Sequence, residues 1–167
     1  MTAATFELEL QGSRAALFAL LRGLSEEQFR FTPRGESWCV ATHLAHLLRI
    51  ERLFTERARR ALDEDEPRVE SSGVTNDDEP ALAQHLAVPQ IVHGMLNARR
   101  DAEALLARCD DAAMARAFVH PRFGRLTVRD VFVKLRDHER EHTAEVARLV
   151  RQVPPSARVT VPLMRRS

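Results

Sequence analysis

Two histidines near the C-terminal end of the chain, His138 and His142, have a spacing that suits metal binding. They lie four residues apart in the segment LRDHEREH of residues 135–142. Positions i and i+4 of a helix share one face, so both imidazoles can reach the same ion. His142 falls well inside the apolar face of this segment and His138 lies near its edge. Imidazoles at such positions need partners for their ring nitrogens, which either a metal ion or hydrogen bonds to core groups would supply.

The same residues match the H-E-x-x-H pattern of zinc peptidases. In that class of enzyme the two histidines bind zinc and the glutamate, here Glu139, acts as the general base. The residues downstream do not complete the pattern. Glu145 stands where a metzincin has glycine, Arg148 stands where its third histidine would be, and no acidic residue follows Glu145. A peptidase is therefore the least favoured interpretation, and a third ligand has to come from upstream.

Of the five other histidines, two are candidates for that third ligand. His43 and His46 lie in a strongly amphipathic stretch, and the periodicity favours His43, which is closer to the centre of the apolar face. That position suits a metal ligand and a plain core residue equally well. His85, His93 and His120 have no partner at ligand spacing, so they are predicted to be surface or connector residues.

The elements that would position these residues are helical. Apolar residues recur at three- and four-residue spacing in four stretches, and no stretch shows convincing strand alternation. Ser37 and Thr127 are the predicted N-caps of the second and fourth helices. The pattern predicts an all-α four-helix bundle in one domain, residues 1–152, with an extended tail over 153–167. The expected helices span residues 5–22, 38–62, 80 or 89 to 108, and 127–152, with a long loop over 63–79.

Composition narrows the classes of partner. Hydrophobic residues make up 44% of the 167-residue chain and charged residues 29%, as in soluble globular proteins. The formal net charge is +1, which argues against a nucleic-acid partner. The basic residues are almost all arginine, and Lys134 is the only lysine. No signal-peptide pattern opens the chain and no stretch approaches the roughly 18 apolar residues of a membrane span, so we expect no membrane partner and a cytoplasmic location.

Two segments resemble a known family. ESWCVATHLAHL, residues 36–47, is similar to the signature of the DinB/YfiT-like family. In that signature a tryptophan, here Trp38, opens the second helix, and a histidine eight residues on, here His46, binds metal. HPRFGRLTV, residues 120–128, together with the histidine pair that follows, resembles the C-terminal block of the family. The order of elements agrees from about residue 6 to residue 152.

The resemblance implies a bundle of the DinB-like type with a metal held by His46, His138 and His142. This choice of His46 goes against the periodicity, and His43 stays as the alternative. Three neutral imidazoles leave coordination positions open, as in catalytic rather than structural sites. A divalent ion, zinc or nickel before others, is the expected cofactor.

The resemblance also implies a range of activities. Family members act as thiol-dependent transferases or isomerases with a small thiol cofactor, or as hydrolases, so we expect a small-molecule substrate; a homodimer is also expected. Glu139 is the candidate catalytic group, with a solvated helix charge as the alternative, and the same two interpretations apply to Glu51. A different class of function also stays open, namely a non-catalytic helical stress protein that binds metal or a partner.

Overall fold

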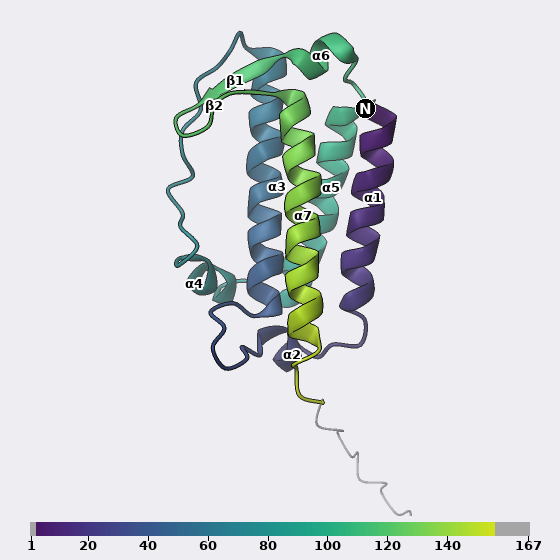
Figure 1. The fold of residues 1–167 in the computed structure, drawn as a ribbon, viewed down its shortest axis with the longest axis vertical. Coiled ribbons are helices and arrows are strands. Elements are labelled where there is room, and N and C mark those ends of the chain that lie inside the picture. The colour runs from purple at the N-terminus through teal and green to yellow at the C-terminus, as the bar shows by residue number, and fades with distance from the viewer. Residues whose placement is uncertain (1–2, 156–167) are drawn as a thin grey trace, which may run out of the picture.

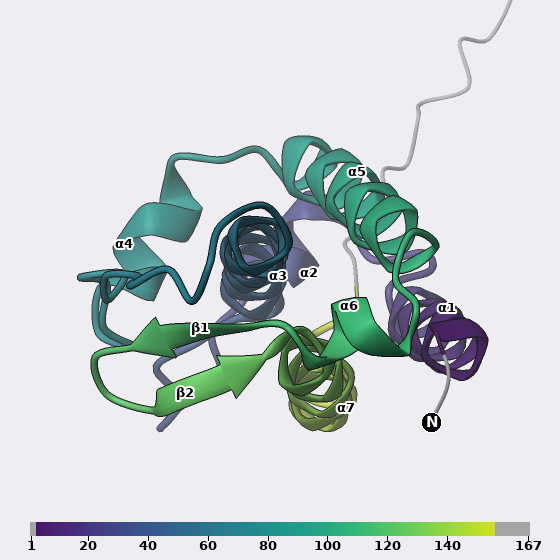
Figure 2. The ribbon, with the colours of Figure 1, turned by 90° about the horizontal axis from the view of Figure 1, so that it is seen from above.

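Four long helices form the molecule, in the computed structural model that describes residues 3–155 (Figure 1). They confirm the predicted four-helix bundle. Seen from above, α3 lies between α5 and α7, and α1 packs beside α7 (Figure 2). The long helices are α1 (Ala3–Leu20), α3 (Val40–Asp63), α5 (Val88–Leu106) and α7 (Val128–Val150).

The connections give the bundle its topology. Helices α1 and α7 run in one direction along the bundle, and α3 and α5 run in the other (Figure 1). Because α3 and α5 are parallel, the chain must return along the whole bundle between them. The long loop predicted for residues 63–79 makes this return, together with the short helix α4 (Glu79–Gln84). We call residues 64–78 the crossover loop. Two more short helices, α2 (Glu26–Arg30) and α6 (Asp111–Ala115), lie at opposite ends of the bundle.

The expectation of no strands was wrong at one point. Strands β1 (Ala117–His120) and β2 (Gly124–Thr127) form an antiparallel hairpin just before α7. Gly124 has a positive φ of 71°, which glycine adopts readily at the turn. The crossover loop extends this hairpin, because the Val69 amide donates to the Val119 carbonyl at 3.0 Å. Strand β1 begins with three apolar residues in a row, and β2 alternates over three residues only, so neither shows the strand pattern in sequence.

Local signals set most helix starts. Thr127 caps α7 as predicted, and its side chain and that of Asp130 form a reciprocal capping box. Pro89 lies in the first turn of α5, where a missing amide hydrogen costs nothing. The predicted cap at Ser37 was wrong. Helix α3 begins at Val40, after Cys39, which makes no side-chain capping bond.

The core of the bundle consists of two apolar clusters with a charged layer between them. One cluster lies toward α2 and contains Leu17, Leu44 and Ile91, whereas the other lies toward the hairpin and contains Phe6 and Phe132. Each long helix contributes one buried charged side chain to a network that lies between the two clusters. These four buried residues are Arg14, Glu51, Arg99 and Glu139, and we call them the ionic tetrad.

Two expectations concern the ends of the chain and its surroundings. Of the predicted tail over residues 153–167, only the first three residues are described, and residues 156–167 lie outside the described part. Pro154 accepts a hydrogen bond of 2.7 Å from the Gln28 side chain, which places the end of α7 against α2. None of the helices between residues 3 and 155 is long and apolar enough to cross a membrane.

Candidate metal centre

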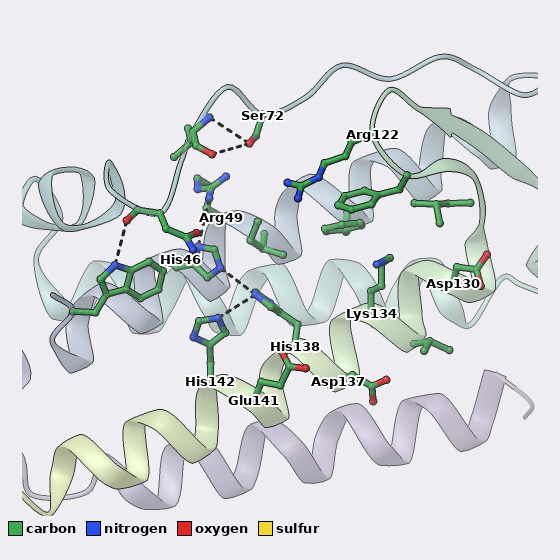
Figure 3. Close-up of a pocket in the computed structure, with 18 residues that line it drawn as sticks. His46, Arg49, Ser72, Arg122, Asp130, Lys134, Asp137, His138, Glu141 and His142 are labelled. Carbon is green, nitrogen blue, oxygen red and sulfur yellow. Dashed lines mark hydrogen bonds between the residues drawn. The ribbon is translucent and has the colours of Figure 1, made fainter. Parts of the chain in front are cut away.

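Three imidazoles converge between α3 and α7 (Figure 3). The Nε2 atom of His138 lies 3.0 Å from Nε2 of His46 and 3.1 Å from Nε2 of His142. The three potential ligand atoms all lie within 4.8 Å of one another. Four-coordinate zinc with Zn–N bonds of 2.0–2.1 Å would separate its nitrogen ligands by about 3.3 Å. The spacing of the three rings is therefore close to what one ion requires.

A count of protons also favours a cation at this position. Nδ1 of His46 lies 2.6 Å from a carboxylate oxygen of Glu79 and donates to it, so Nε2 of neutral His46 carries only a lone pair. Nε2 of His138 faces two other Nε2 atoms, and a single proton on it can satisfy one of them at most. A metal ion would accept the lone pairs of all three nitrogens, so the residues present fit such a group.

His43 lies behind this group rather than in it. Its Nδ1 atom is 2.7 Å from Nδ1 of His142. The other ring nitrogen of His142, Nε2, is the one that faces His138. His43 and His46 are 7% and 6% exposed, so both are buried and burial does not distinguish them. The direction of each ring distinguishes the two histidines. His46 lies with His138 and His142, whereas His43 is placed to orient His142.

Glu79 is a residue of the site that the sequence did not reveal. It is the first residue of α4 and is only 1% exposed. Besides His46, its carboxylate binds the guanidinium of Arg49, with Nε at 3.0 Å. A carboxylate that accepts from the outer nitrogen of a ligating histidine holds the tautomer and the direction of the ring. In sequence Glu79 is one of several acidic residues in a loop, and only the return of the chain brings it to His46.

Burial keeps the four histidines neutral. Burial first, and then neighbouring rings, lower the pKa of His43 and of His138 to about 4 and that of His142 to about 3. Burial also lowers the pKa of His46, although the Glu79 carboxylate opposes this shift. Neutral imidazoles can bind a metal without first losing a proton.

Trp38, the tryptophan of the family signature, covers the histidines. Its ring stacks on that of His142, with a centroid distance of 5.8 Å and an interplanar angle of 12°. It also contacts the rings of His43 and His46 at 4.9 and 5.1 Å. The indole N–H donates to the carbonyl of Asn76 at 3.2 Å. The tryptophan therefore joins the head of α3 to the crossover loop over the site.

A pocket of about 790 Å³ opens from the three imidazoles toward the hairpin. This volume is in the range of small-molecule sites, about 300–1,000 Å³. Helices α3 and α7, the hairpin and the crossover loop all contribute to its wall (Figure 3). Its apolar lining is formed by Ile50, Phe54, Val74, Phe123, Leu126 and Val133.

The predicted roles of Glu139 have no support in the structure. Its side chain is 2% exposed, so it is not a solvated helix charge. One carboxylate oxygen accepts from Arg14 at 2.5 Å, and the other accepts from Arg99 at 2.9 Å and from the hydroxyl of Ser13. Because both oxygens are engaged inside the bundle, this carboxylate is not free to take a proton at the histidines.

Glu51 has the same environment. It is 3% exposed and binds Arg14 and Arg99, each at 2.6 Å. The ionic tetrad thus contains two positive and two negative side chains, one from each long helix. Both glutamates are part of the packing of the bundle, and neither is a group of the pocket floor.

The predictions for the remaining three histidines agree with the structure to different degrees. His85 and His93 are exposed, as predicted. The expectation for His120 was wrong in part, because it lies at the hairpin connector but is 5% exposed. Its Nδ1 accepts from the backbone amides of Arg122 and Phe123 at 3.1 and 3.3 Å. This histidine holds the turn between the strands.

Glu79→Ala is expected to weaken metal binding by about 10–100-fold, since it removes the acceptor that orients His46. Glu79→Gln should lose less affinity, because the amide oxygen can still accept from Nδ1. Titration of the metal-free variants with zinc, followed by calorimetry, measures both. Glu56→Gln, on the exposed face of α3, is the matched control. Unchanged affinity in Glu79→Ala would show that His46 needs no support from α4.

Comparison with known proteins agrees with this architecture. The sequence model of the DinB superfamily matches residues 9–146. Among solved structures, YfiT from Bacillus subtilis, described as a probable metal-dependent hydrolase with an unusual four-helix bundle topology, is similar with a TM-score of 0.77 and 19% identity, over 90% of this chain and 86% of YfiT. TT2238, a four-helix bundle protein, is similar with a TM-score of 0.64 and 21% identity, over 87% of this chain and 98% of TT2238. No curated protein sequence matches significantly. On the match over residues 9–146, the chain belongs to the DinB superfamily.

Proposed function

We propose that this protein is a metal-dependent enzyme that acts on a small molecule, with one divalent ion held by Nε2 of His46, His138 and His142. The observation that carries the proposal is the convergence of three neutral imidazoles at the end of a pocket of about 790 Å³. Zinc and nickel are the favoured ions because imidazole ligands suit both. An ion with three protein ligands keeps positions open for substrate and lowers the pKa of a water or thiol bound there.

The surrounding side chains prepare the site. Glu79 holds the ring of His46, and His43 holds that of His142, so the three Nε2 atoms point to one place without rearrangement. Trp38 covers the rings on the side of the crossover loop and excludes water there. Substrate enters through the side that remains open toward the hairpin.

Glu141 is our candidate for the proton acceptor in place of Glu139. It lines the pocket next to His142 in sequence, and its side chain is exposed (Figure 3). Among the ion pairs of residues 3–155 none includes Glu141, whereas its pocket neighbour Asp137 is bound to Arg136 at 2.7 Å. A carboxylate with free oxygens beside the histidines can accept a proton from a nucleophile in the pocket.

The reaction class follows from two sources of support. YfiT, which has the same fold, is described as a probable metal-dependent hydrolase, so hydrolysis of a small amide or ester is the first candidate. The family resemblance supports a second candidate, transfer or isomerisation with a low-molecular-weight thiol. Both reactions begin with deprotonation of a nucleophile in the pocket, water in one case and a thiol in the other.

The test uses protein loaded with zinc or nickel and a panel of small esters, amides and thiol acceptors. We expect turnover with at least one class, a loss of about 10²–10⁴-fold in kcat in Glu141→Gln, and full metal content in that variant. Glu145→Gln, on the same helix but outside the pocket, is the control. Loaded protein without turnover on any class would favour the non-catalytic metal-binding alternative.

A further inference from the structure

The end of the pocket away from the histidines carries two cationic side chains. Arg122 projects from the turn of the hairpin, and Lys134 projects from α7, one helical turn before His138 (Figure 3). Both line the same cavity as the histidines. The two cations therefore face one ligand space from two different elements.

These two charges have no acidic partner in the described part of the chain. Among residues 3–155, neither side chain takes part in an ion pair or a side-chain hydrogen bond. Instead, both pack on one aromatic ring, that of Phe123, with the Arg122 Cζ atom 5.4 Å and the Lys134 Nζ atom 5.0 Å from its centroid. By contrast, Arg49 in the same lining is bound to Glu79. The ring holds two uncompensated cations near each other at the cost of their mutual repulsion.

Further positive charge lies behind this end of the pocket. Arg57 is 5% exposed, and its guanidinium packs at 5.4 Å over the ring of Phe54, which lines the pocket. Its side chain donates a hydrogen bond of 2.6 Å to a neutral group, the backbone carbonyl of Glu70. Burial lowers the pKa of His120, and Arg57, Arg122 and Lys134 lower it further. The charged groups that lower the pKa of His120 are these three cations.

Among residues 3–155, the acidic residues nearest in the lining form no ion pair with Arg122 or Lys134. The Asp130 carboxylate accepts from the amide and the hydroxyl of Thr127 at 2.8 and 2.7 Å, as part of the cap of α7. Asp137 accepts from Arg136 through both oxygens, at 2.7 and 3.1 Å. Glu141, which takes part in no ion pair among residues 3–155, lies at the other end, beside His142. Asp130 keeps its negative charge because the groups of Thr127 that it binds are neutral, so the hairpin end of the lining carries two positive charges and one negative charge.

We propose that Arg122 and Lys134 bind an anionic group of the substrate, a carboxylate or a phosphate, while its reacting atom lies at the three histidines. The location of the reacting atom rests on the proposed function; the anion site does not. Lys134 lies four positions before His138, so their backbone positions are about 6 Å apart along the helix axis. The substrate is accordingly a small anion whose charged group and reacting bond are separated by a distance on the order of 6 Å.

Direct binding tests the site in protein from which a chelator has removed the metal, so that no metal can bind the anion. The chelator is then removed by dialysis. Inorganic phosphate and succinate are titrated separately by calorimetry, and the tighter of the two identifies the group preferred. Arg122→Gln and Lys134→Gln should each weaken binding at least tenfold. Arg125→Gln is the matched control, because Arg125 lies on the same hairpin, outside the pocket, and is paired with Glu66 at 2.7 Å. Equal affinities in all four proteins, or equal loss in the control, would overturn the proposal.

The single lysine of the chain allows a second measurement that needs no variant. Lys134 and the N-terminal amine are the only primary amines, so an acetylating N-hydroxysuccinimide ester modifies at most two positions. Saturating anion should slow acetylation of Lys134 several-fold, as followed by mass spectrometry, and leave the N-terminal amine unchanged. Equal rates at Lys134 with and without anion would contradict the site. Because no metal is present, this result stands or falls separately from the metal-dependent activity.

Discussion

His46→Ala is expected to abolish metal binding, whereas His43→Ala should only weaken it. The Nε2 atom of His46 lies with those of His138 and His142, so its loss removes one of three donors to the ion. His43 touches only the outer nitrogen of His142. Loss of such a supporting group typically costs about 10–100-fold in affinity, and loss of a ligand should exceed this range. Elemental analysis of the dialysed proteins should find about one metal per chain in the wild type and none in His46→Ala.

Thermal unfolding gives an independent measure of the same difference. A metal that binds only the folded protein stabilises it by about 2.7 kcal/mol at a free concentration of one hundred times Kd. The midpoint of unfolding should therefore rise with added zinc in the wild type, less in His43→Ala, and not at all in His46→Ala. His93→Ala, an exposed position on α5, is the control and should behave as the wild type. If His43→Ala loses all metal and His46→Ala retains it, the ligand set is the one that the hydrophobic periodicity favoured.

Glu139→Gln is expected to destabilise the fold by about 3–5 kcal/mol while leaving the metal site able to bind. The substitution leaves Arg14 and Arg99 with Glu51 as their single counter-charge inside the bundle, and an uncompensated buried charge costs about this much. The free energy of unfolding of small domains is only about 5–15 kcal/mol in total, so the loss is large. Urea unfolding measures it, and zinc titration at low urea measures the site.

Two further variants separate a buried network from an ordinary surface pair. Glu145→Gln removes an exposed pair with Arg148 on the same helix and should cost about 0–1 kcal/mol. The double variant Arg99→Met/Glu139→Leu restores neutrality, because Arg14 and Glu51 remain paired. It should lose less stability than the sum of the two single substitutions. If Glu139→Gln costs no more than Glu145→Gln but removes activity, Glu139 is a group of the reaction after all.

Local spacing in the sequence was sufficient for the helices and for half of the site. Three- and four-residue periodicity located the four long helices, and Thr127 marked the start of α7. His138 and His142 lie on one face of α7 because both belong to the same helix and the helix repeat alone relates them. Residues 36–47 resemble the signature of the family, and this resemblance indicated His46 as the third ligand. These features depend on neighbours within a few residues or on a motif that the sequence contains.

The packing of the helices determined the other features of the candidate site, which the sequence did not predict. His43 and His46 are one turn apart and equally buried, so the rotation of α3 against α7 determines which ring faces His138. Glu79 reaches His46 because the crossover loop returns along the bundle. Glu139 follows His138 by one residue, about 100° around the helix, and therefore faces Arg14 and Arg99 rather than the pocket. Sequence determined which residues share an element, whereas contacts between elements depend on their relative orientation, which no local pattern encodes.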